Sequence, residues 1–309
     1  MELTNKKIVV TGGKGFLGSY VVEKLKEKGA KDIFVPNSKD FDLRERKKCE
    51  EVVKGSDIVI HLAAQIGGIG FINDHSGEVF YNNIIMGVQL MEASRKAGVE
   101  KFVSIGTACE YPESIPLPFK ESDIWKGSPE DVTAPYGWAK KMLIIQGKAY
   151  EKQYGFNAVH ILPVNLYGPG DNFDPKSSPV ISSLIRRIIN ARDTNSLTVE
   201  VWGTGKATRE FLYVEDAAEG IVLATLNHKD AAPVNLGTGI ETSIKDIAKM
   251  IVKIAKYKGK IVWDKTKPDG QPRRQLDVSK TKQFGFIAKT DLQKGLKKTI
   301  QWYQNEARL

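Results

Sequence analysis

The chain has 309 residues, and its 41% hydrophobic and 27% charged content is that of a globular protein long enough for a large core and two lobes. No apolar run reaches membrane-spanning length, and the start carries no signal-peptide pattern, so we expect neither a membrane protein nor a secreted one. Two cysteines, Cys49 and Cys109, are too few for a disulfide framework, which makes the cytoplasm the expected location.

The formal net charge of +9 raises the question of nucleic-acid binding. However, the lysines are spread along stretches that we expect to be helical, such as 245–260 and 294–298, without regular interleaving of aromatic residues. We interpret them as solvated faces that mildly steer an anionic substrate. We therefore expect no nucleic-acid partner.

The first predicted element is a buried strand at residues 8–11, which runs directly into a glycine-rich turn and then an amphipathic helix. Strand, glycine turn and helix are the context that a dinucleotide-binding fingerprint requires. Glycines let the backbone approach a pyrophosphate, and the helix N-terminus offers amides and positive potential. The predicted cofactor contacts in this turn are Gly12, Gly15, Phe16, Leu17 and Gly18.

The second predicted strand, at 32–36, ends in Asn37, Ser38 and Lys39. A protein built for NAD usually places an acidic residue at such a strand end, where it holds the ribose 2′-hydroxyl. An amide, a hydroxyl and an ammonium stand here instead, which favours a 2′-phosphate. The predicted cofactor is therefore NADP, with NAD as the alternative, and Asp42 is expected to reach the adenine.

Further strands at 57–64, 101–105 and 158–162 alternate with helices, one of them at 78–96. This alternation predicts an α/β fold with a doubly wound parallel sheet of the Rossmann type, whose ligands bind beyond the carboxyl ends of the strands. The residues expected at such ends are Gly12, Leu62, Ala63, Ala64, Thr107, Pro163 and Asn165, and all but Thr107 are assigned to the cofactor.

Tyr136 and Lys140 stand four residues apart in a predicted helix, so their side chains share one face. A tyrosine with its ordinary pKa of about 10 is a weak acid or base near neutrality. An ammonium nearby favours the phenolate and moves that pKa toward the working range. The spacing alone is more often structural, but the glycine turn and the hydroxyl of Thr107 favour a catalytic pair that also contacts the cofactor.

The second half of the chain no longer shows the regular alternation of strands and helices. Residues 199–205 have the pattern of a hairpin arm, while 211–214 and 234–236 have the pattern of strands that return to the large sheet. The four histidines are scattered and no ligand spacing typical of a metal site occurs, so we predict no metal.

These patterns predict two domains. A dinucleotide-binding domain would comprise residues 1–172 with a returning segment at 211–238. A smaller α/β lobe, formed by 173–210 and 239–309, would bind the substrate.

Taken together, the motifs resemble the extended short-chain dehydrogenase/reductase family and, within it, the GDP-L-fucose synthases, over nearly the whole chain. The glycine turn, residues 61–69 and 109–112, and the pair Tyr136 and Lys140 are typical of the wider family. The more specific stretches are 165–173, 201–205, 209–212 and 267–274.

The resemblance implies that the substrate is GDP-4-keto-6-deoxy-mannose, which is epimerised at C3 and C5 and then reduced by NADPH at the C4 ketone. Tyr136 would be the proton donor, Lys140 its partner and a ribose ligand, and Thr107 the hydroxyl that orients the ketone. Cys109 matches the base of the epimerisation. The positions that would hold the nucleotide sugar are Asn165, Val180, Arg187, Trp202, Arg209 and Asp277.

One position departs from the family pattern. Pro179 stands where the family has its catalytic histidine, and proline cannot donate a proton. We therefore expect the reduction to be intact and the epimerisation to be impaired. The resemblance also implies a homodimer that pairs through the helices around Asn83 and Tyr136. Two alternatives remain open: a nucleotide-sugar 4-epimerase with tightly bound NAD, and a non-catalytic nucleotide-binding protein.

Overall fold

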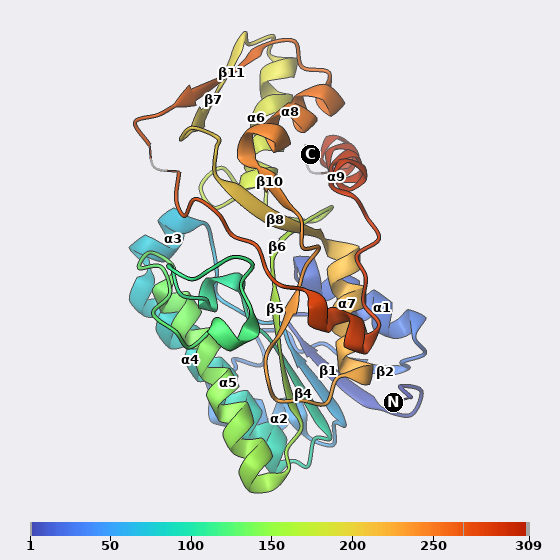
Figure 1. The fold of residues 1–309 in the computed structure, drawn as a ribbon. Helices are drawn as coiled ribbons and strands as arrows, with labels where there is room; N and C mark the ends of the chain where they lie inside the picture. Colours follow the sequence, from blue (N-terminus) through green and yellow to red (C-terminus); the bar gives the residue numbers. More distant parts are fainter. Residues whose placement is uncertain (1, 268, 307–309) are drawn as a thin grey trace.

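The computed structural model describes residues 2–267 and 269–306, and a six-stranded parallel sheet forms its centre (Figure 1). Four of its strands are buried at every residue, as expected for a parallel sheet covered on both faces. In sheet order the strands are β2 (Asp32–Phe34), β1 (Lys7–Thr11), β3 (Ile58–His61), β4 (Lys101–Ile105), β5 (Ala158–Pro163) and β9 (Val234–Leu236). The predicted doubly wound α/β fold is confirmed.

Helices cover both faces of this sheet (Figure 1). Side chains alternate along β1, so that Ile8 and Val10 join the core beneath one helical layer while Val9 joins the core beneath the other. The first layer is α1 (Phe16–Glu27) and α7 (Val214–Asn227), and the second is α2 (Arg46–Val53), α4 (Ser76–Lys96) and α5 (Ala134–Tyr154). A short helix, α3 (Ile69–Asp74), precedes α4.

Two predictions about later strands are wrong. Residues 211–214 do not return to the large sheet, because β8 (Thr208–Tyr213) pairs with β6 (Asn165–Tyr167) and β10 (Glu241–Ser243) in a separate sheet. Residues 199–205 form no hairpin, because β7 (Thr198–Trp202) pairs in parallel with β11 (Lys260–Asp264). A parallel partner needs a long crossover, so local sequence could not reveal it. The return of 234–236, as β9 beside β5, is confirmed.

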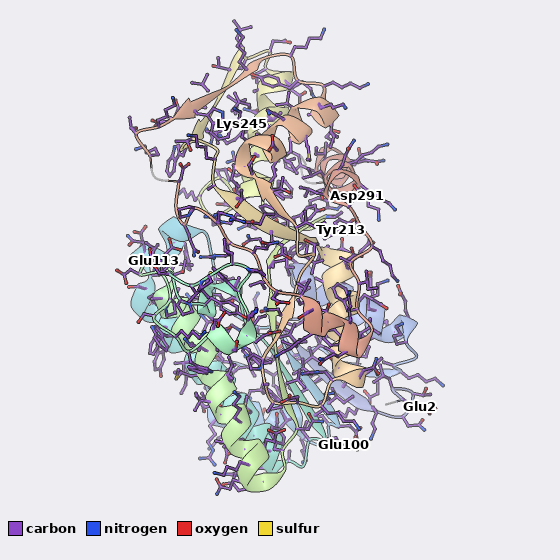
Figure 2. All side chains as sticks on the ribbon, in the orientation of Figure 1. Glu2, Glu100, Glu113, Tyr213, Lys245 and Asp291 are labelled. Carbon is purple, nitrogen blue, oxygen red and sulfur yellow. The ribbon has the colours of Figure 1, made fainter. Side chains whose placement is uncertain are left out.

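A second hydrophobic core lies above the large sheet in the view of Figure 1. It is built from the smaller sheets and the apolar faces of α6 (Val180–Asp193), α8 (Ile244–Ala255) and α9 (Leu292–Glu306). Tyr213, labelled in Figure 2, lies at the end of β8 in this core, with its ring centroid 5.7 Å from that of Tyr167.

Residues 269–276 connect the second core to the first. At one end, the amide of Thr204 donates to the carboxylate of Asp269 at 2.6 Å. At the other end, the amide of Leu276 donates to Glu210 at 2.8 Å, and the Leu276 side chain packs in the large core, as do Phe284 of η3 (Ser279–Phe284) and the following Phe286. Within the described ranges, no helix is long and apolar enough to cross a membrane.

Candidate active site

The turn between β1 and α1 depends on close backbone approaches that only glycine permits. Gly12 has φ +72°, and a Cβ there would lie 2.8 Å from the amide nitrogen of Ala63. A Cβ on Gly18 would lie 2.1 Å from the carbonyl oxygen of Gly12. Gly15 is the N-cap of α1 and makes no side-chain cap, so the first amides of this helix receive no acceptor from a capping side chain. This backbone fits the diphosphate of a dinucleotide.

Phe16 and Leu17 begin α1. The ends of β1 and β3 are joined through the side chain of Thr11. The hydroxyl of Thr11 lies 2.8 Å from Nδ1 of His61 and accepts the amide of Ala63 at 3.3 Å. Burial, together with the charge of Lys140, holds the pKa of His61 well below its usual range, so this imidazole is neutral. Leu62 and Ala63, which follow β3, lie against Gly12 of the glycine turn, and Ala64 comes directly after them.

The stretch Asn37, Ser38 and Lys39 forms a turn after β2, in which the amide of Lys39 donates to Oδ1 of Asn37 at 3.3 Å. This strand end lies against the glycine turn, because a Cβ on Gly13 would lie 2.9 Å from the side chain of Val35. The Ser38 and Lys39 side chains are exposed, which leaves a hydroxyl and an ammonium available to a ligand.

Asp42 lies beyond this turn and is engaged by Arg44, whose Nη2 is 2.6 Å from Oδ2 of the carboxylate. The hydrogen bonds from Arg44 lower the pKa of Asp42. At the edge of the site near β2, Arg44 and Asp42 therefore neutralise each other, and the exposed ammonium of Lys39 lies next to the exposed Asp40 in sequence.

Tyr136 and Lys140 lie on one face of α5 and are 5% and 2% exposed. Nζ of Lys140 is 5.9 Å from the centroid of the Tyr136 ring. Pro135, in the first turn of α5, presets the helical backbone next to Tyr136.

The pKa values of this pair differ from the sequence-based expectation. Burial raises the pKa of Tyr136, and the charges of Cys109 and Glu110 raise it further. Burial lowers the pKa of Lys140 to about 8. The loss of hydration thus outweighs the attraction of the ammonium for a phenolate. A tyrosine that retains its proton is suited to donating it.

Thr107 and Cys109 occupy a tight turn after β4, in which Thr107 caps the one-turn helix η1 (Ala108–Glu110). The Thr107 hydroxyl oxygen accepts the amide of Cys109 at 3.2 Å. Gly137 of α5 packs directly on this turn, because a Cβ there would lie 2.3 Å from the carbonyl oxygen of Cys109. Because Gly137 has no side chain, the start of α5 that carries Tyr136 packs directly on Cys109, two residues from Thr107.

Two arginines from the second half of the chain approach Cys109. Nη1 of Arg274 is 3.5 Å from the Cys109 sulfur, and Nη2 is 3.2 Å from Glu130. Nη1 of Arg209 donates to the carbonyl of Gln271 at 2.6 Å, and burial and the charge of Arg274 lower the pKa of Arg209. Two guanidinium groups therefore face the same side of the site, an arrangement suited to phosphate oxygens.

The remaining candidate residues are spread over the second half of the chain. Pro163 ends β5, and Asn165 begins β6 with its Nδ2 donating to the carbonyl of Glu210 at 3.3 Å. Pro179 is the N-cap of α6, with φ −63°, and Val180 is the first residue of that helix.

Arg187 and Trp202 lie at the edge of the second core. Arg187 donates to the carbonyl of Glu200, and burial lowers its pKa. Trp202 is 63% exposed, with Nζ of Lys267 5.5 Å from its ring centroid. Asp277 lies where the chain has returned to the large core, and its carboxylate accepts the amide of Ser279 at 2.9 Å.

Three further residues lie in this region and were not predicted as site residues from the sequence: Glu110, His160 and Arg274. Arg274 was only part of a motif, and its contact with Cys109 joins positions that are distant in the sequence. Two polar signals were available: His160 interrupts an otherwise apolar strand, and Glu110 directly follows Cys109. A polar residue inside a buried strand usually has a specific partner.

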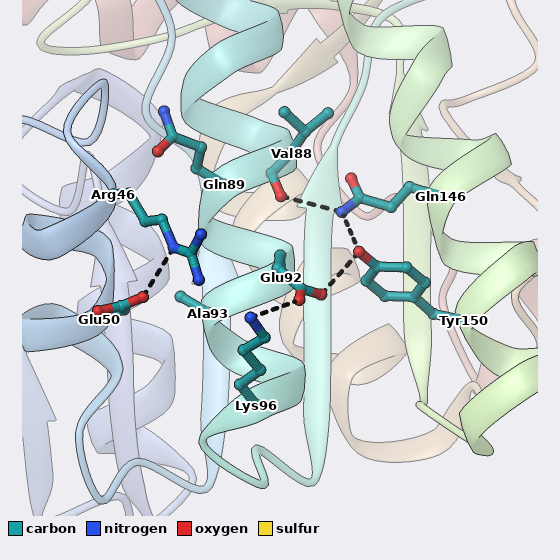
Figure 3. A pocket seen from close by; sticks show the side chains of 9 residues that line it. All are labelled: Arg46, Glu50, Val88, Gln89, Glu92, Ala93, Lys96, Gln146 and Tyr150. Carbon is teal, nitrogen blue, oxygen red and sulfur yellow. Dashed lines mark hydrogen bonds and ion pairs between the residues drawn. The ribbon is translucent and has the colours of Figure 1, made fainter.

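A cavity of about 280 Å³ lies away from these groups, between α2, α4 and α5 (Figure 3). Its charged side chains pair with one another, as in Arg46 with Glu50 at 2.9 Å and Lys96 with Glu92 at 3.2 Å. The hydroxyl, thiol, phenol and ammonium groups that could perform chemistry gather instead beyond the strand ends, where we place the candidate active site.

The chain is similar to known proteins over nearly its whole length. Residues 8–237 match the NAD dependent epimerase/dehydratase family. A relative from Oryza sativa subsp. japonica, named "Probable GDP-L-fucose synthase 1", is 35% identical over 300 residues, which cover 96% of this chain and 92% of the relative.

Two solved structures share the fold. A GDP-6-OMe-4-keto-L-xylo-heptose reductase from C. jejuni has a TM-score of 0.91 and 26% identity, with 98% of this chain and 99% of the other covered. A GDP-L-fucose synthetase from Naegleria fowleri, bound to NADP, has a TM-score of 0.88 and 28% identity, with coverages of 99% and 96%. On this similarity and on the match of residues 8–237, the chain belongs to the NAD dependent epimerase/dehydratase family.

Proposed function

We propose that this chain is an NADPH-dependent reductase of the C4 ketone of a GDP-linked 4-keto-6-deoxy sugar, similar to GDP-L-fucose synthase. The observation that carries the proposal is the buried pair Tyr136 and Lys140, packed through Gly137 against the Thr107–Cys109 turn. The names of the rice relative and of the two solved structures support a GDP-linked keto sugar as the substrate.

The cofactor would lie across the carboxyl ends of the strands and would supply the hydride that reduces C4. Asn37, Ser38 and Lys39 include no carboxylate, and the exposed hydroxyl of Ser38 and ammonium of Lys39 favour the 2′-phosphate of NADPH, although the exposed Asp40 follows in the same turn. The residues proposed to contact the cofactor are Gly12, Gly15, Phe16, Leu17, Gly18, Asn37, Ser38, Lys39, Asp42, Leu62, Ala63, Ala64, Tyr136, Lys140, Pro163 and Asn165.

Three side chains take part in protonating the ketone oxygen: Thr107, Tyr136 and Lys140. The hydroxyl oxygen of Thr107 already accepts the Cys109 amide, so its hydrogen is available to the substrate. Tyr136 transfers its proton to the oxygen as C4 gains the hydride, and the ketone becomes an alcohol. The ammonium of Lys140 stabilises the phenolate left on Tyr136 until a proton returns.

The nucleotide sugar would lie between the two cores. Arg187 and Arg209 are proposed to hold the diphosphate, because a guanidinium offers paired donors and a permanent charge. The exposed ring of Trp202 offers a stacking surface. Asn165, Val180 and Asp277 complete the proposed substrate contacts.

We further propose that epimerisation at C3 and C5 is impaired. Cys109 provides a base next to the arginines, whereas Pro179 offers no proton at the start of α6. The acid on the opposite face would then be water or a serine hydroxyl from the loop before α6.

The homodimer and the two-domain division are also proposals. Phe80 and Tyr81 of α4 and Ile145 and Tyr154 of α5 are 40% to 59% exposed, which supports pairing of these helices with a second copy. The domains would be 1–172 with 211–238, and 173–210 with 239–309. Both cysteines are free, which is consistent with a reducing cytoplasm.

The test is incubation of the purified protein with GDP-4-keto-6-deoxy-mannose and NADPH. We expect stoichiometric consumption of NADPH and formation of a GDP-linked 6-deoxyhexose. If NADPH is not consumed, but NAD copurifies and a nucleotide sugar is inverted at C4, the chain is a 4-epimerase. If nucleotide sugars bind without any turnover, the chain is a binding protein.

A further inference from the structure

A chain of buried polar side chains lies directly beneath the Thr107–Cys109 turn. Oε1 of Glu110 accepts the backbone amide of Thr107 at 2.8 Å, and Oε2 lies 3.0 Å from Nε2 of His160 on β5. Nδ1 of His160 lies 2.7 Å from the hydroxyl of Ser104 on β4. Ser104, Glu110 and His160 are 1%, 0% and 2% exposed, so water does not compete for these bonds.

The hydrogen positions are constrained by what each group can donate. The carboxylate of Glu110 is an acceptor, so Nε2 of His160 carries a hydrogen and donates to it. The Ser104 hydroxyl can donate either to Nδ1 or to the carbonyl of Val159 at 3.3 Å. Neutral and charged imidazole are both satisfied by these partners, and in both states Glu110 is held from two sides.

A capping role alone does not account for this arrangement. Thr107 and Glu110 form a capping box, which ordinarily needs only local residues. Here the carboxylate is fully buried, which costs free energy that an apolar side chain would not cost. The backbone just before Thr107 also leaves space for the Glu110 carboxylate and the His160 ring. A Cβ on Gly106 would lie 2.2 Å from Oε1 of Glu110 and 2.3 Å from Nε2 of His160.

The hydrogen bond from the Thr107 amide to Glu110 affects the positions of the Thr107 hydroxyl and the Cys109 thiol. The amide of Thr107 is fixed by Glu110, and the Thr107 hydroxyl in turn accepts the amide of Cys109. A rotation of this turn would therefore displace the hydroxyl and the thiol together. The charge of Glu110 also raises the pKa of Lys140 against the effect of burial, which helps to keep that ammonium charged.

We propose that Glu110, held by His160 and Ser104, is a positioning residue that keeps the hydroxyl of Thr107 and the sulfur of Cys109 aligned with Tyr136. The inference rests on the proposed reductase activity for its catalytic consequence. The alignment itself is a property of the protein and can be measured without the substrate.

The first experiment compares steady-state kinetics of variants that remain folded by thermal melting. Glu110→Ala should lower kcat for ketone reduction by about 10²-fold, the scale of a small misplacement of reacting groups, with the KM for NADPH within about threefold. Glu110→Gln retains an acceptor for the Thr107 amide and should recover kcat to within about tenfold of the original chain. The matched control is Glu121→Ala, which removes another buried carboxylate that accepts a backbone amide, that of Asn235 at 3.0 Å. This control should leave kcat unchanged per folded molecule.

The second experiment measures alkylation of Cys109 by iodoacetamide in the full-length protein without substrate. We expect the rate to change at least about fivefold in Glu110→Ala and to stay near the original in Glu110→Gln and Glu121→Ala. The fully buried Cys49 provides an internal reference. If the original chain reduces no GDP-linked keto sugar, the proposed function fails, and this experiment still decides the positioning role.

The proposal is overturned if Glu110→Ala leaves both kcat and the Cys109 alkylation rate within about threefold of the original values. Equal losses in Glu110→Ala and Glu121→Ala would also overturn it, because they would reflect general destabilisation. If Glu110→Ala does not fold, Ser104→Ala and His160→Gln replace it. Unchanged kinetics and alkylation in both of these variants would overturn the proposal.

Discussion

The guanidinium of Arg274 lies 3.5 Å from the sulfur of Cys109, and Glu130 holds the same guanidinium at 3.2 Å. At this distance the guanidinium can hydrogen-bond the sulfur and fix its position in the site. Arg274→Met should therefore change the rate of Cys109 alkylation by at least about fivefold at neutral pH, and Arg274→Lys should stay closer to the original rate. Peptide mapping after iodoacetamide treatment measures this. Equal rates in Arg274→Met and the original chain would contradict it.

Tyr136→Phe removes the proposed proton donor and leaves the buried ring in place. We expect kcat for ketone reduction to fall by about 10²-fold or more, the usual scale for a lost general acid. NADPH binding, followed by fluorescence titration, should be unchanged. Near-normal turnover would show that another group protonates the ketone.

Lys140→Met should reduce activity and raise stability at the same time. The folded pKa of Lys140 is about 8, below its ordinary 10.5, so the folded chain binds fewer protons than the unfolded chain between these pH values. Burying the ammonium therefore costs stability below pH 8, and this cost declines as the pH rises from 8 toward 10.5. We expect Lys140→Met to raise the free energy of unfolding by about 1–3 kcal/mol at pH 7.

Urea denaturation at neutral and alkaline pH measures this effect, and the advantage of Lys140→Met should shrink at the higher pH. Lys148, on the exposed side of α5, provides the control, because Lys148→Met should leave the free energy of unfolding nearly constant. A variant at Lys140 that is less stable than the original chain at pH 7 would refute the argument.

The turn after β2 should prefer NADPH to NADH. Ser38 and Lys39 are exposed there, and Asn37, Ser38 and Lys39 include no carboxylate, the first one in the turn being Asp40. Ser38→Asp should weaken NADPH binding at least about tenfold, because a carboxylate beside a phosphate is repulsive and suits a ribose hydroxyl instead. Fluorescence titration with both cofactors decides this. Tighter binding of NADH by the original chain would favour the 4-epimerase alternative.

Pro179 should limit proton exchange at C3 and C5. Incubation with GDP-4-keto-6-deoxy-mannose in deuterated water without NADPH, followed by NMR, should show exchange slowed by about 10²-fold or more relative to a family member with histidine. Pro179→His should increase the exchange. Fast exchange at both carbons in the original chain would mean that another residue replaces the histidine and that the chain performs the whole conversion.

The sequence revealed the large sheet well because its signals are local. Residues 101–105 form β4 as predicted, and the helix predicted at 78–96 begins two residues earlier, at Ser76. Apolar periodicity and glycine turns are visible in a short window. The partners of β7 and β8 were missed because strand pairing across a long crossover leaves no such local mark.

The candidate site was recognisable only where a motif marks it. Thr107, Tyr136 and Lys140 stand at spacings that indicate their chemistry. The contact of Glu110 with His160 and that of Arg274 with Cys109 depend on how distant segments pack. The raised pKa of Tyr136 likewise follows from its burial, which no spacing reveals.

Residues 269–276 form neither a helix nor a strand, but their length is constrained by three attachments. Asp269 is tied to the second core, Arg274 to Cys109 and Leu276 to the first core, with few residues between these attachments. Inserting or deleting one residue would move the guanidinium from the sulfur and the leucine from its packing site together. The segment can therefore tolerate changes of residue type between its attachments, but it has little freedom to change in length.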